Sequence, residues 1–423
     1  MKNSLRLCLL GIALCLSSLT IAQERASQPM DNILFIGNSY VEVNNLPLEL
    51  YRVASSVGIE FQYQTNAPGS CTFQGHCNNA SMGLIQQGGW DYVILQEQSQ
   101  YPSFPLSQVQ NEVFPFAKRL VDSVYKYSPC GIPMFYMTWG RKYGDSSNAA
   151  EYPPLGTYEG MDSLLYERYM MMKESNNAAV SPVGRVWHYI RDNYPSIELY
   201  QGDNSHPMMI GTYAAACSFL AAIWGVDPTT VTYVPSGLDA TQAADVRTAA
   251  KVVVYDNLPQ WRRKPADANF TYEVNDNLVQ FNSPNSPGIS YEWDFGDGIT
   301  STRGVEVHKY LATGTYAVTL VATNHCEADT LTQTIVVSTI SGIDNVETAD
   351  IRIVVSSDNV LTVKANELIR NVKVFTIGGI EVLDAVVEAN DFTISLPTCP
   401  AGVYVVKAVL RNGNETTQNI IIK

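Results

Sequence analysis

Residues 33–39 read ILFIGNS, a short apolar run that ends at a glycine and is followed at once by a serine hydroxyl. The run predicts a strand that is buried on both faces, as in a parallel sheet. Ser39 would then lie at the carboxyl end of that strand, where open α/β sheets bind ligands. Far downstream, residues 202–207 read GDNSHP and supply Asp203 and His206. Serine, histidine and aspartate are together the components of a hydrolytic nucleophile.

A serine hydroxyl is a weak nucleophile near neutral pH and needs a base within hydrogen-bond distance. The chain has five histidines, and two of them, His308 and His325, follow the region of alternating strands and helices. His76 lies in the loop that Cys71 and Cys77 would close, and His188 lies in a helical stretch, where a packed or surface histidine is expected. His206 follows Asp203 by three residues, so that one turn can bring the carboxylate back to the imidazole.

Short apolar runs and helical segments alternate from residue 31 to about residue 260. Strands are expected at 32–36, 59–64, 91–95 and 133–137, and helices near 46–57, 78–87, 107–127, 158–176 and 207–224. This alternation predicts an α/β domain at 23–264, with a parallel sheet and helices on both faces. After residue 264 helical periodicity ends, and two all-β sandwich domains are expected at 265–339 and 345–423.

The first 22 residues are predicted to be a signal peptide. Lys2 and Arg6 precede an apolar stretch that ends in small residues before Gln23. The stretch is too short for a stable membrane span, and no later segment is apolar for 18 residues. We therefore expect an exported protein, secreted or held at the cell surface. The net charge of −14 disfavours a nucleic-acid partner, because no basic stripe is present to bind phosphates.

Six of the eight cysteines remain after the predicted signal peptide. Export permits disulfides, and Cys71 and Cys77 are close enough in sequence to close one loop. We weigh that pair equally against two free thiols. No Cys-x-x-Cys pair with a matching histidine pair is present, so a structural zinc site is not indicated.

The two β regions carry motifs of their own. Residues 291–298 read YEWDFGDG; this string resembles the polycystic-kidney-disease (PKD)-type immunoglobulin-like module, with Trp293 and Phe295 in the core and the aspartates forming a turn. Residues 372–379 read VKVFTIGG and residues 401–406 read AGVYVV. These resemble the C-terminal sorting domain of the type IX secretion system, which implies the type IX secretion machinery as a partner. The alternative is a second adhesive β-sandwich.

The region 31–260 resembles the SGNH (GDSL-like) serine hydrolases at four places. They are GNS at 37–39, PGS at 68–70, QEQS at 96–99 and the pair Asp203 and His206. The resemblance implies a flavodoxin-like three-layer α/β/α fold. The usual family motif has aspartate where this chain has Asn38. After the third strand most members have Gly-x-Asn-Asp, whereas QEQS looks like the variant of sialate O-acetylesterase-like members.

The resemblance also implies roles for the site residues. Ser39 is the nucleophile, His206 the base and Asp203 the residue that orients it. The backbone N–H groups of Ser39 and Gly69 and the amide of Gln96 are expected to form the oxyanion hole, with Gln98 and Gln100 as alternatives to Gln96. No metal or organic cofactor is implied. Independently of the resemblance, the segment from Trp139 to Tyr143 follows the fourth strand at the same edge and, with Tyr101 and Phe104, is a candidate for an aromatic wall that contacts a sugar or acyl group.

The function expected from the resemblance is a secreted serine esterase that hydrolyses O-acyl groups, above all acetyl, on a carbohydrate. The alternative is a non-catalytic, carbohydrate-binding surface protein built on a hydrolase scaffold. The complete Ser39, Asp203 and His206 set favours the esterase. The missing asparagine after the third strand favours the binding protein.

Overall fold

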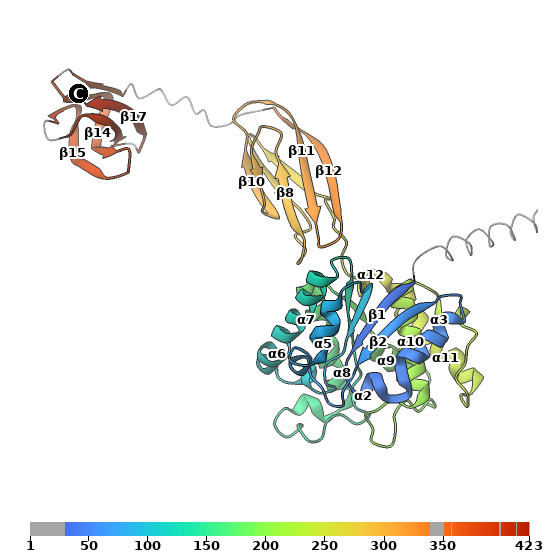
Figure 1. Cartoon of the computed structure of the whole chain (residues 1–423). Coiled ribbons are helices and arrows are strands. Elements are labelled where there is room, and N and C mark those ends of the chain that lie inside the picture. The colour runs from blue at the N-terminus through green and yellow to red at the C-terminus, as the bar shows by residue number, and fades with distance from the viewer. Residues whose placement is uncertain (1–29, 339–350, 357, 397–398, 412, 423) are drawn as a thin grey trace, which may run out of the picture. The chain divides into compact units, whose positions relative to one another are not determined.

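The computed structural model describes residues 30–338, 351–356, 358–396, 399–411 and 413–422 (Figure 1). The predicted signal peptide and the predicted boundary at residue 345 lie outside the described residues. Packing divides the chain into two compact units. The first runs to Glu273 and includes Gln280–His308 and Tyr316–Ile335; the second comprises Val274–Val279, Lys309–Thr315 and Val336–Lys423.

A five-stranded parallel sheet forms the centre of the first unit. Its strands are β1 (Asp31–Ile36), β2 (Phe61–Asn66), β3 (Tyr92–Leu95), β4 (Ile132–Tyr136) and β5 (Ala179–Ser181). They lie in the order β2-β1-β3-β4-β5, and every neighbouring pair is parallel. This is the flavodoxin-like order, whose switch point falls between β1 and β3. The predicted α/β class is confirmed, and Ser39 follows the strand at the switch point.

Helices cover both faces of the sheet. They are α3 (Leu46–Ser55), α5 (Ala80–Gln87), α6 (Leu106–Glu112), α7 (Phe114–Tyr127), α8 (Tyr158–Asn176), α9 (Val183–Asn193), α10 (Met209–Trp224), α11 (Ala240–Val253) and the short α12 (Leu258–Trp261). Figure 1 shows α3, α10 and α11 on one side of the sheet and α5, α6 and α7 on the other. The sheet is therefore the middle of three layers.

Burial in the sheet and in α10 explains why these elements form. All four residues from Ile33 to Ile36 are fully buried, and Phe35 packs edge-on against Phe219 of α10 with ring centroids 6.3 Å apart. The helix α10 is apolar on every side, as expected for a helix inside a large domain. The predicted helix at 107–127 is two helices instead. Pro115, in the first turn of α7, has no N–H to continue the hydrogen bonds of α6, and the chain breaks between the two helices at Val113 (φ −119°).

The segment after α12 forms two small antiparallel sheets. Their strands are β6 (Thr271–Asn275), β7 (Leu278–Asn282), β8 (Ser290–Asp294), β9 (Thr300–Ser301), β10 (Val305–Lys309), β11 (Gly314–Thr323) and β12 (Ala328–Val337), in the orders β10-β7-β6 and β12-β11-β8-β9. Trp293 and Phe295 are buried as predicted. Asp294 accepts a hydrogen bond from Gly296 N at 2.9 Å, so that it stabilises the turn, as the sequence predicts.

The C-terminal part is also all-β. Its strands are β13 (Arg352–Val355), β14 (Val360–Thr376), β15 (Glu381–Ser395), β16 (Gly402–Leu410) and β17 (Glu415–Ile422). They are ordered β13-β14-β16-β17, and β15 also pairs with β14. The long β14 changes register near Ile369, where β-bulges bend strands. A separate apolar core includes Val363, Val374 and Val406. The two predicted all-β parts are therefore present.

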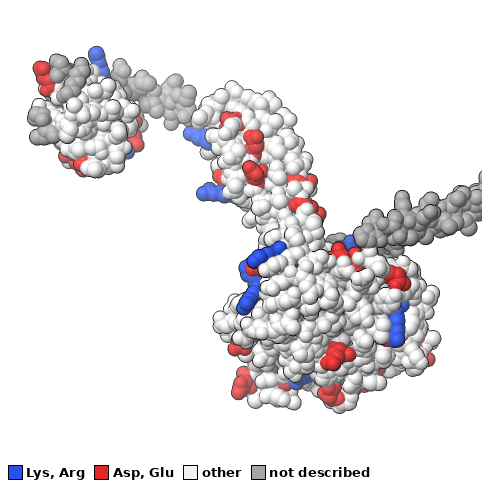
Figure 2. Space-filling model, viewed as in Figure 1, with Lys and Arg blue, Asp and Glu red and all other residues white. Residues whose placement is uncertain are grey.

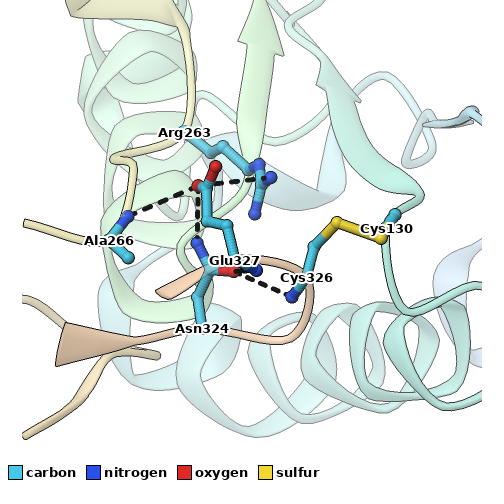
Figure 3. The surroundings of a disulfide bond; sticks show 6 residues. All are labelled: Cys130, Arg263, Ala266, Asn324, Cys326 and Glu327. Carbon is cyan, nitrogen blue, oxygen red and sulfur yellow. Dashed lines mark hydrogen bonds and ion pairs between the residues drawn. A yellow bond between two sulfur atoms is a disulfide. The ribbon is translucent and has the colours of Figure 1, made fainter. Parts of the chain in front are cut away.

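The described residues contain a disulfide between two cysteines that are far apart in the sequence. Cys130, just before β4, is bonded to Cys326 in the loop between β11 and β12 (Figure 3). Cys71 and Cys77 are both free, which is the second of the two alternatives weighed from the sequence. The segment between them forms the helical turn α4 (Phe73–His76), and Cys77 is buried beside the Phe116 carbonyl, with Sγ 3.7 Å from that oxygen.

Polar contacts surround the Cys130–Cys326 bond. Glu327 accepts a hydrogen bond from Asn324 Nδ2 at 2.8 Å and one from Ala266 N at 3.4 Å, and lies 3.6 Å from Arg263 (Figure 3). The ring of His325 stacks on Tyr125 of α7 with centroids 4.2 Å apart. The loop between β11 and β12 is thus tied to the α/β domain by a covalent bond and by direct packing.

Replacing Cys326 with serine is expected to lower the free energy of unfolding by about 2–5 kcal/mol, because the cross-link restricts the unfolded chain. Chemical denaturation of wild type, Cys326→Ser and a Cys399→Ser control measures this loss. Cys399 is a free cysteine, so its replacement should leave the midpoint unchanged. Equal midpoints for all three proteins would contradict a stabilising role for the cross-link.

Among the described residues, no helix has the length and apolarity needed to cross a bilayer. On the face drawn in Figure 2, acidic side chains are scattered and basic side chains occupy only small areas. This distribution agrees with the net charge of −14.

Candidate active site

The turn after β1 holds Ser39. Gly37 N donates to Asn66 O at 3.2 Å, and the chain then enters the short helix α2 (Ser39–Glu42), for which Asn38 is the N-cap. A Cβ atom on Gly37 would lie 2.6 Å from Val41 Cγ2 and 2.7 Å from Gln96 Oε1, so this turn requires glycine. Ser39 is the first residue of α2, where backbone N–H groups have no partner within the helix.

The loop before α10 carries the acid and the base. Asn204 adopts a left-handed conformation (φ 60°) and its N–H donates to Gln201 O at 2.9 Å, while Gln201 N donates to His206 O at 2.8 Å. Asp203 Oδ1 accepts from the backbone N–H groups of both Ser205 and His206 at 3.0 Å. The carboxylate is thus fixed to the backbone of the residue whose ring it faces.

The structure brings Ser39, His206 and Asp203 together. Ser39 Oγ lies 2.8 Å from His206 Nε2 across 167 positions of sequence, and His206 Nδ1 is hydrogen-bonded to Asp203 Oδ2. With the ring proton on Nδ1, facing the carboxylate, the serine hydroxyl donates to Nε2. Partial burial raises the pKa of Asp203, but the hydrogen bonds from the His206 ring and the two backbone N–H groups hold it below its ordinary value.

Aromatic residues pack against the loop that carries Asp203 and His206. Trp139 stacks on Tyr40 with ring centroids 4.7 Å apart and donates from Nε1 to Ser205 O at 3.0 Å. Tyr40 bonds Ser205 Oγ at 2.7 Å and presents its ring to His206 at 5.4 Å. Because Trp139 is fully buried, the prediction that it contacts substrate is wrong. Tyr101 and Phe104 are half-buried and pack against each other with centroids 5.5 Å apart.

Gln96 does not point a free amide at the nucleophile. Its side chain is fully buried; Oε1 accepts from Asn38 N at 2.8 Å, and Nε2 donates to Glu97 O. Through these contacts Gln96 supports the turn that holds Ser39. Its amide N–H group is directed at Glu97 O and not toward an oxyanion beside Ser39, as was predicted. The two alternatives are also engaged, since Gln98 Nε2 donates to Gln100 Oε1 at 3.2 Å and Gln100 Nε2 donates to Asp145 Oδ2 at 2.6 Å.

Gly69 lies in the exposed loop after β2. A Cβ atom built on it would meet nothing within 4 Å, so the space beside its backbone is open. The loop turns at Ser70 (φ 58°), and Cys71 N donates to Pro68 O at 3.1 Å. This segment is connected to the serine turn by Asn38, whose Nδ2 donates to Cys71 O at 3.0 Å.

Two buried titratable groups beneath the site were not predicted. His76 is fully buried, with Nε2 2.9 Å from Gly37 O and Nδ1 2.8 Å from Ser81 Oγ. Burial lowers the pKa of His76 to about 4, so its ring is neutral near pH 7 and supports the turn without charge. Glu97 is fully buried as well. Burial raises the pKa of Glu97 to about 8, although the N–H groups of Gln98 and Phe73 oppose that shift.

Glu97 makes stability dependent on pH. Its pKa is raised above the ordinary value of 4.5, so the folded protein binds more protons than the unfolded chain between pH 4.5 and about 8. The contribution of Glu97 to the free energy of unfolding is complete below pH 4.5. It is lost as the pH rises toward 8, by up to about 1.36 kcal/mol per pH unit.

The free energy of unfolding of wild type minus that of Glu97→Gln is therefore expected to fall as the pH rises from 4.5 to 8. Urea denaturation at four pH values in this interval measures the difference. Glu159→Gln, a change at an exposed glutamate, is the control for the altered net charge. A difference that is flat, or that grows with pH, would show that Glu97 is ionised throughout.

Among the residues that the structure describes, no group of three or more histidine, cysteine or acidic side chains is placed to hold a metal ion. Around Ser39 lie the His206 imidazole, which is hydrogen-bonded to Asp203, and the N-terminus of α2. The arrangement can activate a hydroxyl and can accept and return its proton.

Comparison with known proteins identifies the module after the α/β domain. Residues 265–339 match the model of the PKD domain. The chain covers 95% of the PKD1 domain of a Vibrio cholerae metalloprotease at 39% identity, over 17% of this chain, with a TM-score of 0.16. The chain thus belongs, through this segment, to the PKD-domain family, and the prediction of that module is confirmed.

Solved structures similar to the α/β domain were also found. A DUF4886 family protein from Bacteroides uniformis is 17% identical over 54% of this chain and 97% of its own, with a TM-score of 0.46. A protein from Parabacteroides merdae described as a GDSL-like lipase is 9% identical over 46% of this chain and 95% of its own, with a TM-score of 0.35. No match was found among curated proteins.

Proposed function

We propose that the chain is a serine esterase in which Ser39 is the nucleophile, His206 the general base and Asp203 the residue that orients it. The observation that carries the proposal is the contact of 2.8 Å between Ser39 Oγ and His206 Nε2, with Asp203 on the opposite ring nitrogen. Ser39 and His206 are both partly exposed, so a substrate can reach the hydroxyl from solvent.

In the proposed reaction, Ser39 Oγ attacks the ester carbonyl while His206 Nε2 takes the hydroxyl proton. Asp203 stabilises the imidazolium that results and keeps the ring in the required tautomer. When the tetrahedral intermediate collapses, His206 returns the proton to the departing alcohol. Water, activated by the same imidazole, then releases the acid from Ser39.

The negative oxygen of the intermediate needs N–H donors that are already in place, and losing one typically costs about 2.7–4 kcal/mol of the barrier. We assign two donors, the backbone N–H groups of Ser39 and Gly69. Ser39 N is at the start of α2, and Gly69 leaves open space beside its backbone. Gln96 is assigned a supporting role through its hydrogen bond with Asn38 N.

For the substrate we propose O-acyl esters of a carbohydrate, with acetyl as the acyl group. Support comes from the resemblance of residues 96–99 to sialate O-acetylesterase-like members and from the PKD module that follows the α/β domain. We further propose that the protein is exported, with residues 1–22 as signal peptide and 345–423 as the type IX sorting domain. The sorting machinery would then be a partner of the C-terminal β domain.

A series of p-nitrophenyl esters tests the proposed activity, with acetyl-substituted xylan as the carbohydrate substrate. We expect kcat/KM to fall as the acyl chain lengthens from two to eight carbons, and acetate release from the polysaccharide. Activity that rises with chain length would indicate a lipase. Equal rates for wild type and Ser39→Ala on every ester would favour the non-catalytic binding protein.

A further inference from the structure

Asn38 occupies the position at which the usual motif of the SGNH hydrolases, which residues 37–39 resemble, has an aspartate. It is 2% exposed and lies immediately before Ser39. We propose that Asn38 is a positioning residue whose carboxamide holds together the two segments that carry the oxyanion donors, Ser39 and Gly69. This inference rests on the proposed function, because the donors matter only if an ester is hydrolysed at Ser39.

Besides the two helical hydrogen bonds that its backbone oxygen accepts, Asn38 makes three more, two of which reach other segments of the chain. Its backbone N–H donates to Gln96 Oε1 at 2.8 Å, which ties the turn to the end of β3. Its Oδ1 accepts from Tyr40 N at 3.2 Å, which caps α2. Its Nδ2 donates to Cys71 O at 3.0 Å, which ties the turn to the loop after β2. Both the oxygen and the nitrogen of the Asn38 side-chain amide are therefore hydrogen-bonded.

The hydrogen bond to Cys71 O requires an amide at position 38. Cys71 O is a carbonyl oxygen and accepts only from a donor, whereas an ionised carboxylate has none. An aspartate at position 38 would keep the cap on Tyr40 N but would place a negative oxygen against a carbonyl oxygen. The loop that holds Gly69 and Cys71 would have to move away, and a displacement of about 1 Å in a reaction site can cost roughly 10²-fold in rate.

A glutamate already lies beside this loop. The next segment of the same loop is held by Glu97, which accepts from Phe73 N at 3.0 Å. A carboxylate at position 38 would add a second acidic group to this buried region. The hydrogen bond from Asn38 to Cys71 therefore links the nucleophile turn to the loop without adding charge.

The test compares Asn38→Asp and Asn38→Ser with wild type and with Asn277→Asp. Serine keeps an oxygen for the cap but is too short to reach Cys71. Asn277 is the matched control: it is 4% exposed and its Nδ2 donates to Tyr310 O at 3.0 Å, but it lies in the PKD module. On p-nitrophenyl acetate we expect both Asn38 variants to lose about 10- to 100-fold in kcat. Their KM should stay within about twofold, and Asn277→Asp should keep the wild-type kcat.

Hydrogen exchange over residues 67–73 is measured on the same four proteins. Faster exchange there in both Asn38 variants, and not in Asn277→Asp, is expected whether or not the chain is an esterase. A wild type without Ser39-dependent activity would sink the proposed function alone. Unchanged exchange in this loop, or a kcat within twofold of wild type in both Asn38 variants, would overturn the positioning role.

Discussion

Ser39→Ala is expected to lower kcat for p-nitrophenyl acetate by roughly 10⁴- to 10⁶-fold, since removing the nucleophile of such a triad abolishes the covalent route. The side chain makes its hydrogen bond with His206 Nε2 and is only partly buried. Its loss therefore removes the reacting oxygen with little effect on packing. Steady-state kinetics over at least three decades of enzyme concentration would measure the fall.

Ser123→Ala is the control for this experiment, because Ser123 is a helix serine whose Oγ donates only to Arg119 O at 2.8 Å. It should retain the wild-type rate, and both variants should unfold at the wild-type temperature. A Ser39→Ala protein that is folded and keeps more than a tenth of the activity would mean that another residue carries the chemistry.

Asp203→Asn should be the second most damaging change, with kcat lower by roughly 10⁴-fold at pH 7. The amide keeps an oxygen that can accept from Ser205 N and His206 N, so the loop should remain folded. What is lost is the carboxylate that accepts from His206 Nδ1. Without it, the ring no longer presents an unprotonated Nε2 to Ser39, and the imidazolium is no longer stabilised.

Asp239→Asn is a matched control for that variant. Asp239 also accepts from two successive backbone N–H groups, of Thr241 and Gln242, both at 2.9 Å, but it caps α11. Its replacement should leave kcat unchanged. If Asp203→Asn kept kcat within tenfold of wild type, Asp203 would have only a structural role in its loop.

The central sheet could be predicted from sequence because β1, β3 and β4 contain short apolar runs followed by turn residues. Two elements, β5 and α11, were not predicted, because neither has a clear pattern of apolar residues. β5 has only three residues, Ala179–Ser181, too few to show a period. α11 (Ala240–Val253) is rich in alanine, and only four of its residues are buried, so it shows no clear apolar stripe.

At the site, the spacing of residues in the sequence was enough to predict the contact between Asp203 and His206. The sequence did not show which side chains are already hydrogen-bonded inside the protein. Asp203 and His206 are three residues apart, so one turn decides their contact. The partners of Gln96 are Asn38 N and Glu97 O, and nothing in the string QEQS shows that this amide is consumed inside the protein. The same holds for Cys130 and Cys326, whose sequence separation of 196 leaves no local signal.

Activation of Ser39 by His206 is tested most directly by labelling the full chain with a serine-directed fluorophosphonate, followed by peptide mass mapping. One adduct is predicted, on the peptide that contains Ser39, and His206→Ala should label about 10²- to 10⁴-fold more slowly because the base is gone. An adduct on a different serine, or equal labelling rates for wild type and His206→Ala, would contradict activation of the Ser39 hydroxyl by His206.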